Sequence, residues 1–349
     1  MSPSTSRRAV AVLLTALCAG AALPVAASAK AQDLKVMTRN VYLGADLIPL
    51  AAAPDQAAFE QAAAQRFQTV LGNAFPTRAK ALAAEIRKAR PDIIGVQEAT
   101  IWRRGADGVK DGSTTPATQV IYDSSKELRK ALKGTYREIV GRDWFDFEAP
   151  TALGYDVRVT QRDVILVRKA SKLKVRKTFR GQFTNHFDPP TPVGVARQLR
   201  GWVGVDGTLA KRKFRFVSTH LEAYSPAIAN QQMQQLLKSP LSSKTRQSIL
   251  VGDYNSAPGA NANDRGTTRT DNAYDSAIKA GFRNNLPRRK TCCFGEDLHS
   301  TADKLETWID HVLVRPRIKV LRSGIVGTRQ VGGLYPSDHA GITATLRLK

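Results

Sequence analysis

The segment from Ser248 to Pro258 carries residues well suited to chemistry. Its apolar run, Ile249 to Val251, is bounded by turn residues and predicts a buried strand. Asp253 and Asn255 follow, and residues two apart in an extended segment point to the same side. The carboxylate can bind a metal or orient water, and the amide can donate to a developing oxyanion. An Asp/Asn turn after a core strand would leave the same pattern, so this segment alone does not decide.

Other polar side chains end or follow predicted strands elsewhere in the chain. Taken alone, a charged strand end such as Glu98 is more commonly a solvated terminus, and a histidine such as His220 is more often structural. Strand ends of α/β sheets, however, are where ligands bind. Such residues recur at several strand ends along the chain. These residues are Asn40, Glu98, His220, Asp310, Asp338 and His339.

The elements that must position these residues alternate between strands and helices, and they predict an α/β fold in one domain. We expect strands at residues 34–41, 91–98, 136–140, 164–167, 195–205, 213–219, 307–314 and 342–348. We expect helices at residues 55–71, 77–89, 118–132, 226–237 and 274–280. Loops are expected at residues 103–116, 143–148 and 259–270.

The first 31 residues have the pattern of a secretory signal peptide. Arg7 and Arg8 precede an apolar run from Ala9 to Leu23, and small residues follow up to Ala29. An uncleaved anchor is the alternative, although the run is short and Ala-rich for a membrane span. We therefore expect residues 1–31 to be removed and residues 32–349 to be secreted.

Cysteine is scarce outside the predicted signal peptide, where only Cys292 and Cys293 remain. Adjacent cysteines rarely bond to each other because the geometry is strained, and their spacing does not suit a zinc site. We expect two reduced or partly buried thiols in a loop. The fold should then depend on its core and not on a disulfide framework.

The chain is strongly basic, with 53 Lys and Arg against 30 Asp and Glu and a formal net charge of +23. This balance favours polyanions such as nucleic acid, anionic lipid headgroups or wall polymers. Residues 169–180 are densely basic, with Leu173, Val175 and Phe179 between the charges. They predict an amphipathic strand whose outer face is either a polyanion contact or a solvated surface.

In chain order, these motifs resemble the endonuclease/exonuclease/phosphatase superfamily. This superfamily includes pancreatic-type deoxyribonucleases, abasic-site endonucleases, bacterial sphingomyelinases and inositol polyphosphate 5-phosphatases. The resemblance covers residues 34–349 and implies one catalytic domain, a four-layer α/β/β/α sandwich of two mixed β-sheets packed face to face with helices outside. The matching motifs are Thr38-Arg39-Asn40-Val41, Gly95-Val96-Gln97-Glu98, Ser218-Thr219-His220-Leu221, Gly252-Asp253-Tyr254-Asn255-Ser256, Ile309-Asp310-His311-Val312 and Ser337-Asp338-His339.

The resemblance implies a divalent metal held by oxygen ligands. Glu98 would be the main ligand, with Asn40 beside it and Asp338 as a further metal or water ligand. Hard oxygen donors suit Mg²⁺, with Mn²⁺ or Ca²⁺ as alternatives.

The resemblance also implies the catalytic residues. Asp253 would orient or deprotonate the attacking water, and Asn255 would stabilise charge developing on phosphorus. His339, held by Asp310, would contact the scissile phosphate or transfer a proton. His220 would contact a non-bridging oxygen or protonate the leaving group. Which histidine is the base and which the acid stays open.

Three departures from the family pattern leave the substrate open. Residues 44–91 are longer than in a minimal nuclease, and His311 follows Asp310 where many members have an aromatic or aliphatic residue. In several members an acidic or aromatic residue pairs with the histidine at the position of His220. No such partner is evident here, although Asp163 lies near the expected place.

We expect a secreted, metal-dependent phosphodiesterase that acts on nucleic acid, because the basic charge would neutralise a phosphate backbone. One alternative is a sphingomyelinase-like enzyme acting on phospholipid headgroups at a membrane surface, which would need an exposed aromatic hairpin such as Trp144-Phe145. An inositol-phosphate phosphatase and a non-catalytic polyanion-binding protein are further alternatives. No obligate protein partner is evident.

Overall fold

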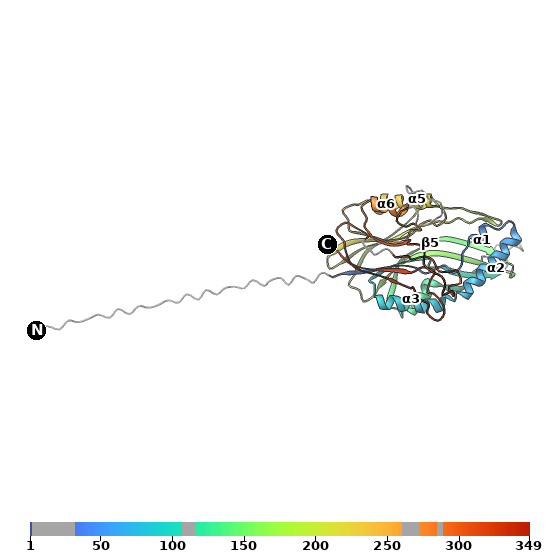
Figure 1. The fold of residues 1–349 in the computed structure, drawn as a ribbon, viewed down its shortest axis with the longest axis horizontal. Coiled ribbons are helices and arrows are strands. Elements are labelled where there is room, and N and C mark those ends of the chain that lie inside the picture. The colour runs from blue at the N-terminus through green and yellow to red at the C-terminus, as the bar shows by residue number, and fades with distance from the viewer. Residues whose placement is uncertain (2–31, 107–115, 260–271, 285–288) are drawn as a thin grey trace. The chain divides into compact units, whose positions relative to one another are not determined.

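The computed structural model describes residue 1 and residues 32–106, 116–259, 272–284 and 289–349. Gln32–Lys349 form one compact unit, in which helices lie on two opposite sides of the strands (Figure 1). The predicted signal peptide and nearly all of the predicted 259–270 loop lie outside the described residues. Within the described part of the chain, no helix is long and apolar enough to cross a membrane.

The described strands form two mixed sheets and a short two-stranded ribbon. The larger sheet has the order β14-β15-β1-β2-β6-β3-β4, with β5 also paired to β6, and the smaller has the order β13-β12-β11-β10-β7. The larger sheet contains β1 (Leu34–Asn40), β2 (Ile93–Gln97), β3 (Ile101–Ala106), β4 (Gln119–Asp123), β5 (Tyr136–Pro150), β6 (Tyr155–Arg168), β14 (Lys319–Val326) and β15 (Gly341–Arg347). The smaller contains β7 (Lys174–Gln182), β10 (Gly201–Leu209), β11 (Arg212–His220), β12 (Ser248–Asp253) and β13 (Asp310–Arg315); the ribbon is β8 (Pro190–Thr191) and β9 (Gly194–Val195).

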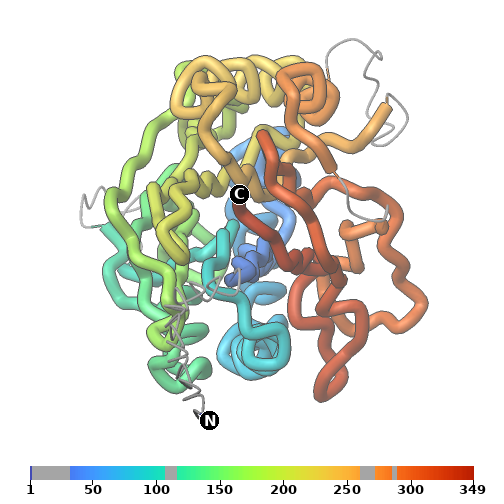
Figure 2. The backbone as a smooth tube through the Cα atoms, turned by 90° about the vertical axis from the view of Figure 1, so that its left-hand side faces the viewer, coloured from blue at the N-terminus to red at the C-terminus, as the bar shows by residue number. Residues whose placement is uncertain are grey.

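The helices cover the outer face of each sheet. Figure 2 shows α5 and α3 on opposite sides of the strands. The larger sheet packs against α2, α3 and α4, and the smaller sheet packs against α5 and α6. The helices are α1 (Ile48–Ala51), α2 (Gln56–Gly72), α3 (Phe75–Ala89), α4 (Ser124–Ala131), α5 (Pro226–Lys238) and α6 (Ala273–Lys279).

Side-chain alternation along the strands explains the layers. In β1, Val36 packs between the sheets, whereas Met37 packs against the helices outside the larger sheet. In β12, Ile249 and Val251 face the other sheet, whereas Leu250 faces the outer helices. Because both faces of β12 are buried, its run from Ile249 to Val251 is continuously apolar. The predicted α/β/β/α sandwich is confirmed.

Three predicted elements were wrong. Residues 119–123 form β4 and not the start of a helix, because Asp123 caps α4 by accepting a hydrogen bond from Lys126 N at 3.0 Å. Residues 101–106 form β3, which pairs with β6, where a loop was expected from residue 103. The predicted 143–148 loop lies inside β5, which pairs with β6 along its length.

Candidate active site

Two parallel pairings bring the predicted site residues to one end of the space between the sheets. In the larger sheet, Asn40 of β1 pairs with Gln97 of β2. In the smaller sheet, His220 pairs with Asp253, and Asp253 pairs with Asp310. Asn40, His220, Asp253 and Asp310 each lie an even number of residues from a side chain of the inter-sheet core. Alternation therefore turns all four towards the opposite sheet.

Glu98 reaches the site through a change of backbone conformation. Gln97 faces the smaller sheet, where its Nε2 donates to Ser218 Oγ at 2.8 Å, so simple alternation would turn Glu98 outward. The φ of 57° at Glu98 places it in the left-handed region and redirects the side chain. Its Oε1 accepts from Asn40 Nδ2 at 3.0 Å, and its Oε2 accepts from Leu43 N at 2.7 Å.

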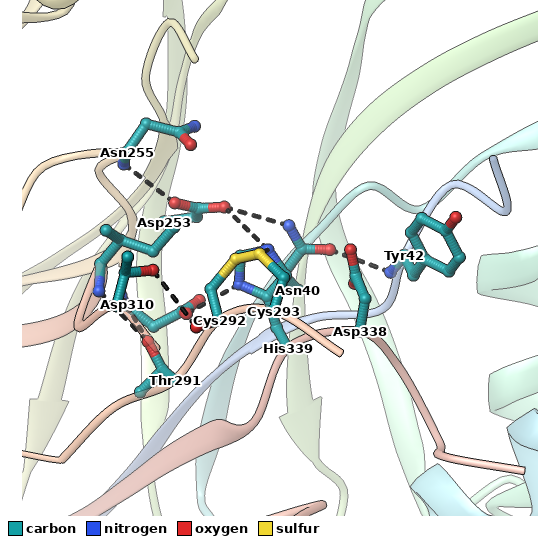
Figure 3. Close-up of a disulfide and its surroundings, with 12 residues drawn as sticks. Asn40, Tyr42, Asp253, Asn255, Thr291, Cys292, Cys293, Asp310, Asp338 and His339 are labelled. Carbon is teal, nitrogen blue, oxygen red and sulfur yellow. Dashed lines mark hydrogen bonds and ion pairs between the residues drawn. A yellow bond between two sulfur atoms is a disulfide. The ribbon is translucent and has the colours of Figure 1, made fainter. Parts of the chain in front are cut away.

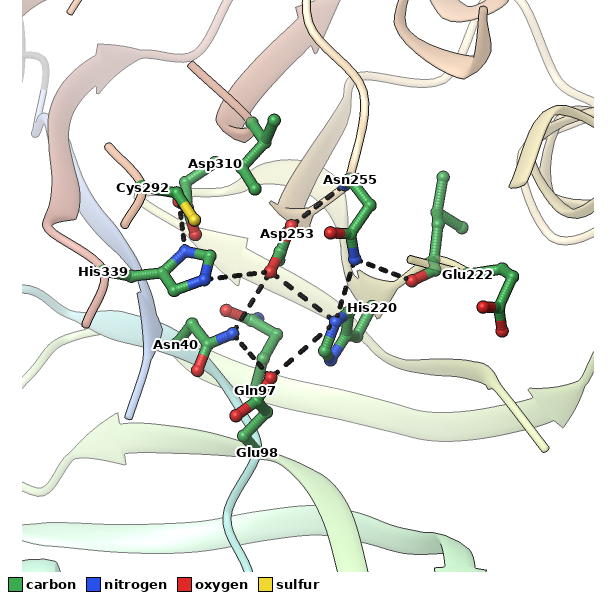
Figure 4. Close-up of polar contacts among 12 residues, drawn as sticks. Asn40, Gln97, Glu98, His220, Glu222, Asp253, Asn255, Cys292, Asp310 and His339 are labelled. Atoms are coloured by element: carbon green, nitrogen blue, oxygen red, sulfur yellow. Dashed lines mark hydrogen bonds and ion pairs between the residues drawn. The ribbon is translucent and has the colours of Figure 1, made fainter. Parts of the chain in front are cut away.

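The carboxylate of Asp253 lies at the centre of the site (Figure 4). Its Oδ2 accepts from Asn40 Nδ2 at 3.1 Å and lies 3.5 Å from His220 Nε2 and 3.6 Å from His339 Nε2. Its Oδ1 accepts from Asn255 N at 2.9 Å. Asp253 is 1% exposed, so these contacts form away from bulk water.

The Nδ1 side of the His339 ring contacts a carboxylate. The His339 Nδ1 and Asp310 Oδ2 lie 2.8 Å apart, and both residues are buried. Burial alone would lower the pKa of His339, but Asp310, Asp338 and Asp253 raise that pKa well above its usual value. His339 is therefore suited to carry a proton at neutral pH.

The Nδ1 side of the His220 ring, in contrast, contacts a cation. Arg200 Nη1 lies 3.0 Å from His220 Nδ1. Burial, Arg200 and His339 all lower the pKa of His220 well below its usual value. The Asp163 carboxylate does not pair with His220; it accepts from Trp144 Nε1 at 3.0 Å.

The chemistry of the donor set fits a divalent cation. The carboxylates of Glu98 and Asp253 offer oxygen atoms that lie within 4.8 Å of each other. Burial raises the pKa of Asp253 to about 7, which His339 partly offsets. A buried carboxylate with this pKa lacks compensating positive charge, which a bound cation would supply.

Two of the predicted ligands are placed differently from Glu98. Asn40 presents its amide nitrogen to both carboxylates, and its Oδ1 accepts from Tyr42 N at 2.9 Å. Asp338 lies outside the metal-capable clusters of the described residues and accepts from Ser337 Oγ at 3.2 Å. Burial raises the pKa of Asp338 to about 6.

A cavity of about 440 Å³ opens at this site. Glu98, His220, Asp253, Asn255 and His339 form its polar side. The apolar side is formed by Leu43, Leu47, Phe145, Tyr224 and neighbouring residues.

Arg200 also lines the cavity and was missed in the sequence. It directly precedes β10, whose first residue, Gly201, pairs with His220 at the end of the antiparallel β11. Its position just before an apolar strand was the available signal. A strand that runs antiparallel to β11 starts where β11 ends, so residues before its start lie beside His220.

Cys292 and Cys293 line the same cavity, and the structure joins them by a disulfide (Figure 3). The expectation of two reduced thiols was therefore wrong. Cys293 Sγ lies 3.9 Å from His339 Nε2. The cysteine pair therefore lies beside the catalytic candidates.

The aromatic pair considered for membrane docking is not at the surface. Trp144 is 3% exposed and Phe145 is 5% exposed. Trp144 packs in the core between the sheets, and Phe145 packs in the core beneath the helices. Both aromatic side chains therefore belong to the packed core.

A sequence model described as Endonuclease/Exonuclease/phosphatase family matches residues 70–339, well over half of the chain. The chain belongs to this family. Endonuclease/exonuclease/phosphatase proteins generally use divalent metals and act on phosphoester bonds, so this protein is a phosphoester hydrolase. Among curated proteins, no significant match was found.

Solved structures share the endonuclease/exonuclease/phosphatase fold with this chain. A family protein of Bacteroides thetaiotaomicron has a TM-score of 0.59 at 15% identity, covering 91% of this chain and 98% of its own. The mannosyl-6-phosphatase Bt3783 of Bacteroides thetaiotaomicron VPI-5482 has a TM-score of 0.56 at 16% identity, covering 90% and 99%. A family protein of Leptotrichia buccalis C-1013-b has a TM-score of 0.54 at 14% identity, covering 90% and 100%. At these identities the likeness concerns the fold.

Proposed function

We propose that this endonuclease/exonuclease/phosphatase protein is a divalent-metal-dependent phosphodiesterase that hydrolyses nucleic acid by in-line attack of water. The observation that carries the proposal is the position of the Asp253 carboxylate. It lies within 3.6 Å of two histidine Nε2 atoms and 3.1 Å from the amide that also binds Glu98. This arrangement provides a base, two donors and a metal-capable carboxylate around one cavity.

Glu98 would hold the cation, with Asp253 facing it across the Asn40 amide nitrogen. When bound, a divalent cation lowers the pKa of a water ligand and compensates charge on a phosphate. Asn40 would keep the two carboxylates apart and oriented by donating to both. Asp338 would act from outside this cluster, on a water ligand.

The protein's own side chains supply the proton transfers. A carboxylate whose pKa is raised to about 7 is suited to accept a proton from the attacking water near neutral pH. His339, charged through Asp310, would donate to a phosphoryl oxygen or to the leaving group. Asn255, whose Nδ2 lies 3.2 Å from His220 Nε2, would stabilise charge on the phosphate from the same side.

A basic edge strand supports a nucleic acid over a lipid. Lys174, Arg176, Lys177 and Arg180 of β7 are exposed, and within the described residues none of them forms an ion pair. The C-terminal end of β7 pairs with Gly201, next to Arg200 in the cavity. Nine residues of strand span roughly 30 Å, so the row of cations leads from the cavity along the edge of the smaller sheet.

The surface of the described residues shows no aromatic docking site. The exposed large hydrophobic side chains there are Met1, Leu71, Val120, Leu153, Val195 and Val331. A sphingomyelinase-like enzyme would need aromatic side chains available to enter a membrane. We therefore favour a secreted nuclease over a phospholipid phosphodiesterase.

The test is hydrolysis of plasmid DNA, RNA, sphingomyelin and an inositol phosphate side by side, with Mg²⁺ or with chelator. Asp253→Ala and His339→Ala serve as inactive controls. Magnesium-dependent cleavage of DNA or RNA, lost in both variants, is the expected result. Turnover of sphingomyelin or the inositol phosphate alone would overturn the nucleic-acid assignment, and tight binding without turnover would overturn the enzyme assignment.

A further inference from the structure

The contact between Arg200 and His220 fixes the hydrogen-bond polarity of an active-site histidine. Arg200 Nη1 and His220 Nδ1 lie 3.0 Å apart, and the two residues are 5% and 2% exposed. A guanidinium has donors and no acceptor. The Nδ1 atom must therefore be the acceptor, which leaves the ring proton on Nε2.

The other ring nitrogen points into the site. His220 Nε2 lies 3.5 Å from Asp253 Oδ2 and 3.9 Å from Glu98 Oε1. It also lies 3.2 Å from Asn255 Nδ2, which donates to Leu221 O at 3.0 Å. Both ring nitrogens of neutral His220 therefore face donors, and only one of them can accept. The charged guanidinium, at 3.0 Å, is the stronger donor, so Nδ1 accepts and the Nε2 proton is directed at the carboxylate oxygens in the cavity.

His339 has the opposite polarity. Its Nδ1 faces the carboxylate of Asp310 at 2.8 Å, so Nδ1 is the donor. Its Nε2, 3.6 Å from Asp253 Oδ2, is therefore the nitrogen that can exchange a proton with the site. The two histidines approach Asp253 from similar distances with different partners behind them, and this difference separates their tasks.

We propose that Arg200 is a positioning residue that holds His220 in the Nε2-protonated tautomer. His220 then donates a fixed hydrogen bond to a non-bridging phosphoryl oxygen, and proton transfer falls to Asp253 and His339. The catalytic part of this inference rests on the proposed phosphodiesterase function. The tautomer itself does not depend on it.

Arg200 replaces the acidic or aromatic partner expected for His220. A carboxylate at this position would draw the ring proton to Nδ1 and leave Nε2 as an acceptor. Arg200 Nη1 also lies 3.4 Å from Gln161 Oε1, which helps to hold the guanidinium against the ring. A cation behind His220 therefore converts a potential base into a donor.

The direct test is the ¹⁵N NMR spectrum of the imidazoles in the purified protein, with and without Mg²⁺ at one fixed pH. The chain has only five histidines, and His220→Gln assigns the signal of His220. We expect an unprotonated Nδ1 and a protonated Nε2 in the wild type and in Arg200→Lys, because an ammonium group is also only a donor. In Arg200→Met the two nitrogens should shift towards exchange between tautomers. An unchanged pattern in Arg200→Met, or a protonated Nδ1 in the wild type, would overturn the proposal.

Kinetics on bis(p-nitrophenyl) phosphate test the catalytic part. Arg200→Met should lower kcat by about 100-fold with little change in KM, and Arg200→Lys should restore part of the loss. Arg200→Met combined with His220→Gln should be no slower than His220→Gln alone, because Arg200 acts through His220. A further loss in the double variant would mean that Arg200 contacts the substrate directly and would overturn the positioning role.

A second arginine controls for damage to the fold. Arg215 lies at the other end of the smaller sheet, where it pairs with Asp206 at 2.7 Å. Arg215→Met should lower thermal stability without moving the His220 nitrogen signals or kcat. If the protein hydrolyses no phosphodiester at all, the proposed function fails, whereas the NMR result still decides the tautomer.

Discussion

At the scale of the residue, the properties of each catalytic side chain depend on its hydrogen-bond partner. His339 is backed by Asp310 and His220 by Arg200, so two chemically identical rings have pKa values shifted in opposite directions. His339 is therefore suited to carry a proton at neutral pH, whereas His220 stays neutral. Asp253, with its pKa raised to about 7, lies between them.

Asp310→Asn tests the charge on His339. The amide removes the largest electrostatic contribution that raises the pKa of His339, so this pKa should fall. If His339 acts in its protonated form, activity will be lost as pH rises through that lowered pKa, and the alkaline limb of the pH–rate profile will move to lower pH. We expect kcat at neutral pH to fall by about 10²- to 10⁴-fold. Asp275→Asn, on α6, is the matched control, and an unmoved alkaline limb in Asp310→Asn would contradict the assignment.

The affinity for metal should depend on the proton of Asp253. Without metal its pKa is raised to about 7, and a cation must displace the proton that the carboxylate holds below this pH. Affinity for Mn²⁺, measured by calorimetry, should therefore fall by up to about tenfold for each pH unit below 7 and level off above it. Asp253→Asn should remove this pH dependence of Mn²⁺ affinity. A wild-type affinity that stays constant between pH 5.5 and 7 would contradict the prediction.

At the scale of the element, strand alternation accounts for much of the site. The alternation of side chains along β12 correctly turned Asp253 towards the opposite sheet. Alternation does not place Glu98, because this residue itself has a left-handed backbone conformation. No local sequence pattern predicts that conformation. Asn255 also has positive φ, 47°, a conformation that asparagine adopts more readily than most residues.

The close approach of β11 and β12 depends on Gly252. Its φ is +146°, and a Cβ there would overlap the Thr219 carbonyl oxygen. Gly252→Ala should lower the free energy of unfolding by about 3 kcal/mol and reduce activity, because it moves the neighbouring Asp253. Chemical denaturation measures the first effect and the hydrolysis rate the second.

Gly154 provides the matched control for Gly252. It has φ +77°, and a Cβ added there would meet no atom within 4 Å. Gly154→Ala should lose only about 1 kcal/mol, from the left-handed backbone, and should keep full activity. Equal losses in the two variants would mean that the close approach to Thr219 is unimportant.

At the scale of the whole molecule, the sandwich brings together residues 300 positions apart. Arg39 Nη1 donates to the His339 carbonyl oxygen, which ties β1 to the segment before β15. The buried apolar runs and the order of the motifs predicted this fold and most of its strands. β14 was missed because its side chains alternate only partly between basic and apolar, and β4 was hidden in a segment with helical composition.

What the sequence could not supply was the neighbour of each site residue. Asp163 lay near the expected position of a partner for His220, but Arg200 occupies it. The hairpin of β10 and β11 decides this, because its turn sets the register that places Gly201 opposite His220. The strand was predicted to start at residue 195, and this early start hid that register. The adjacent cysteines likewise gave no sign that they line the cavity.

The net charge of +23 should make substrate binding strongly dependent on salt. Replacing Lys174, Arg176, Lys177 and Arg180 by Gln should weaken binding of a single-stranded oligonucleotide to the catalytically inactive Asp253→Ala protein. The slope of log K against log salt should fall by about 0.7 for each phosphate that the protein no longer neutralises. A quadruple Gln variant of Lys80, Arg87, Lys88 and Lys126, on α3 and α4, is the charge-matched control. Equal effects in the two variants would contradict a binding role for β7.

The most direct test of the account is the rate of bis(p-nitrophenyl) phosphate hydrolysis as a function of Mg²⁺ concentration. We predict no hydrolysis with chelator, saturation with Mg²⁺ in the wild type, and a shift to higher Mg²⁺ in Glu98→Gln, because one carboxylate ligand is removed. Asp253→Ala should stay inactive at every Mg²⁺ concentration. Hydrolysis that persists in chelator, or a Glu98→Gln curve that overlays the wild type, would contradict a metal-dependent site built around Glu98 and Asp253.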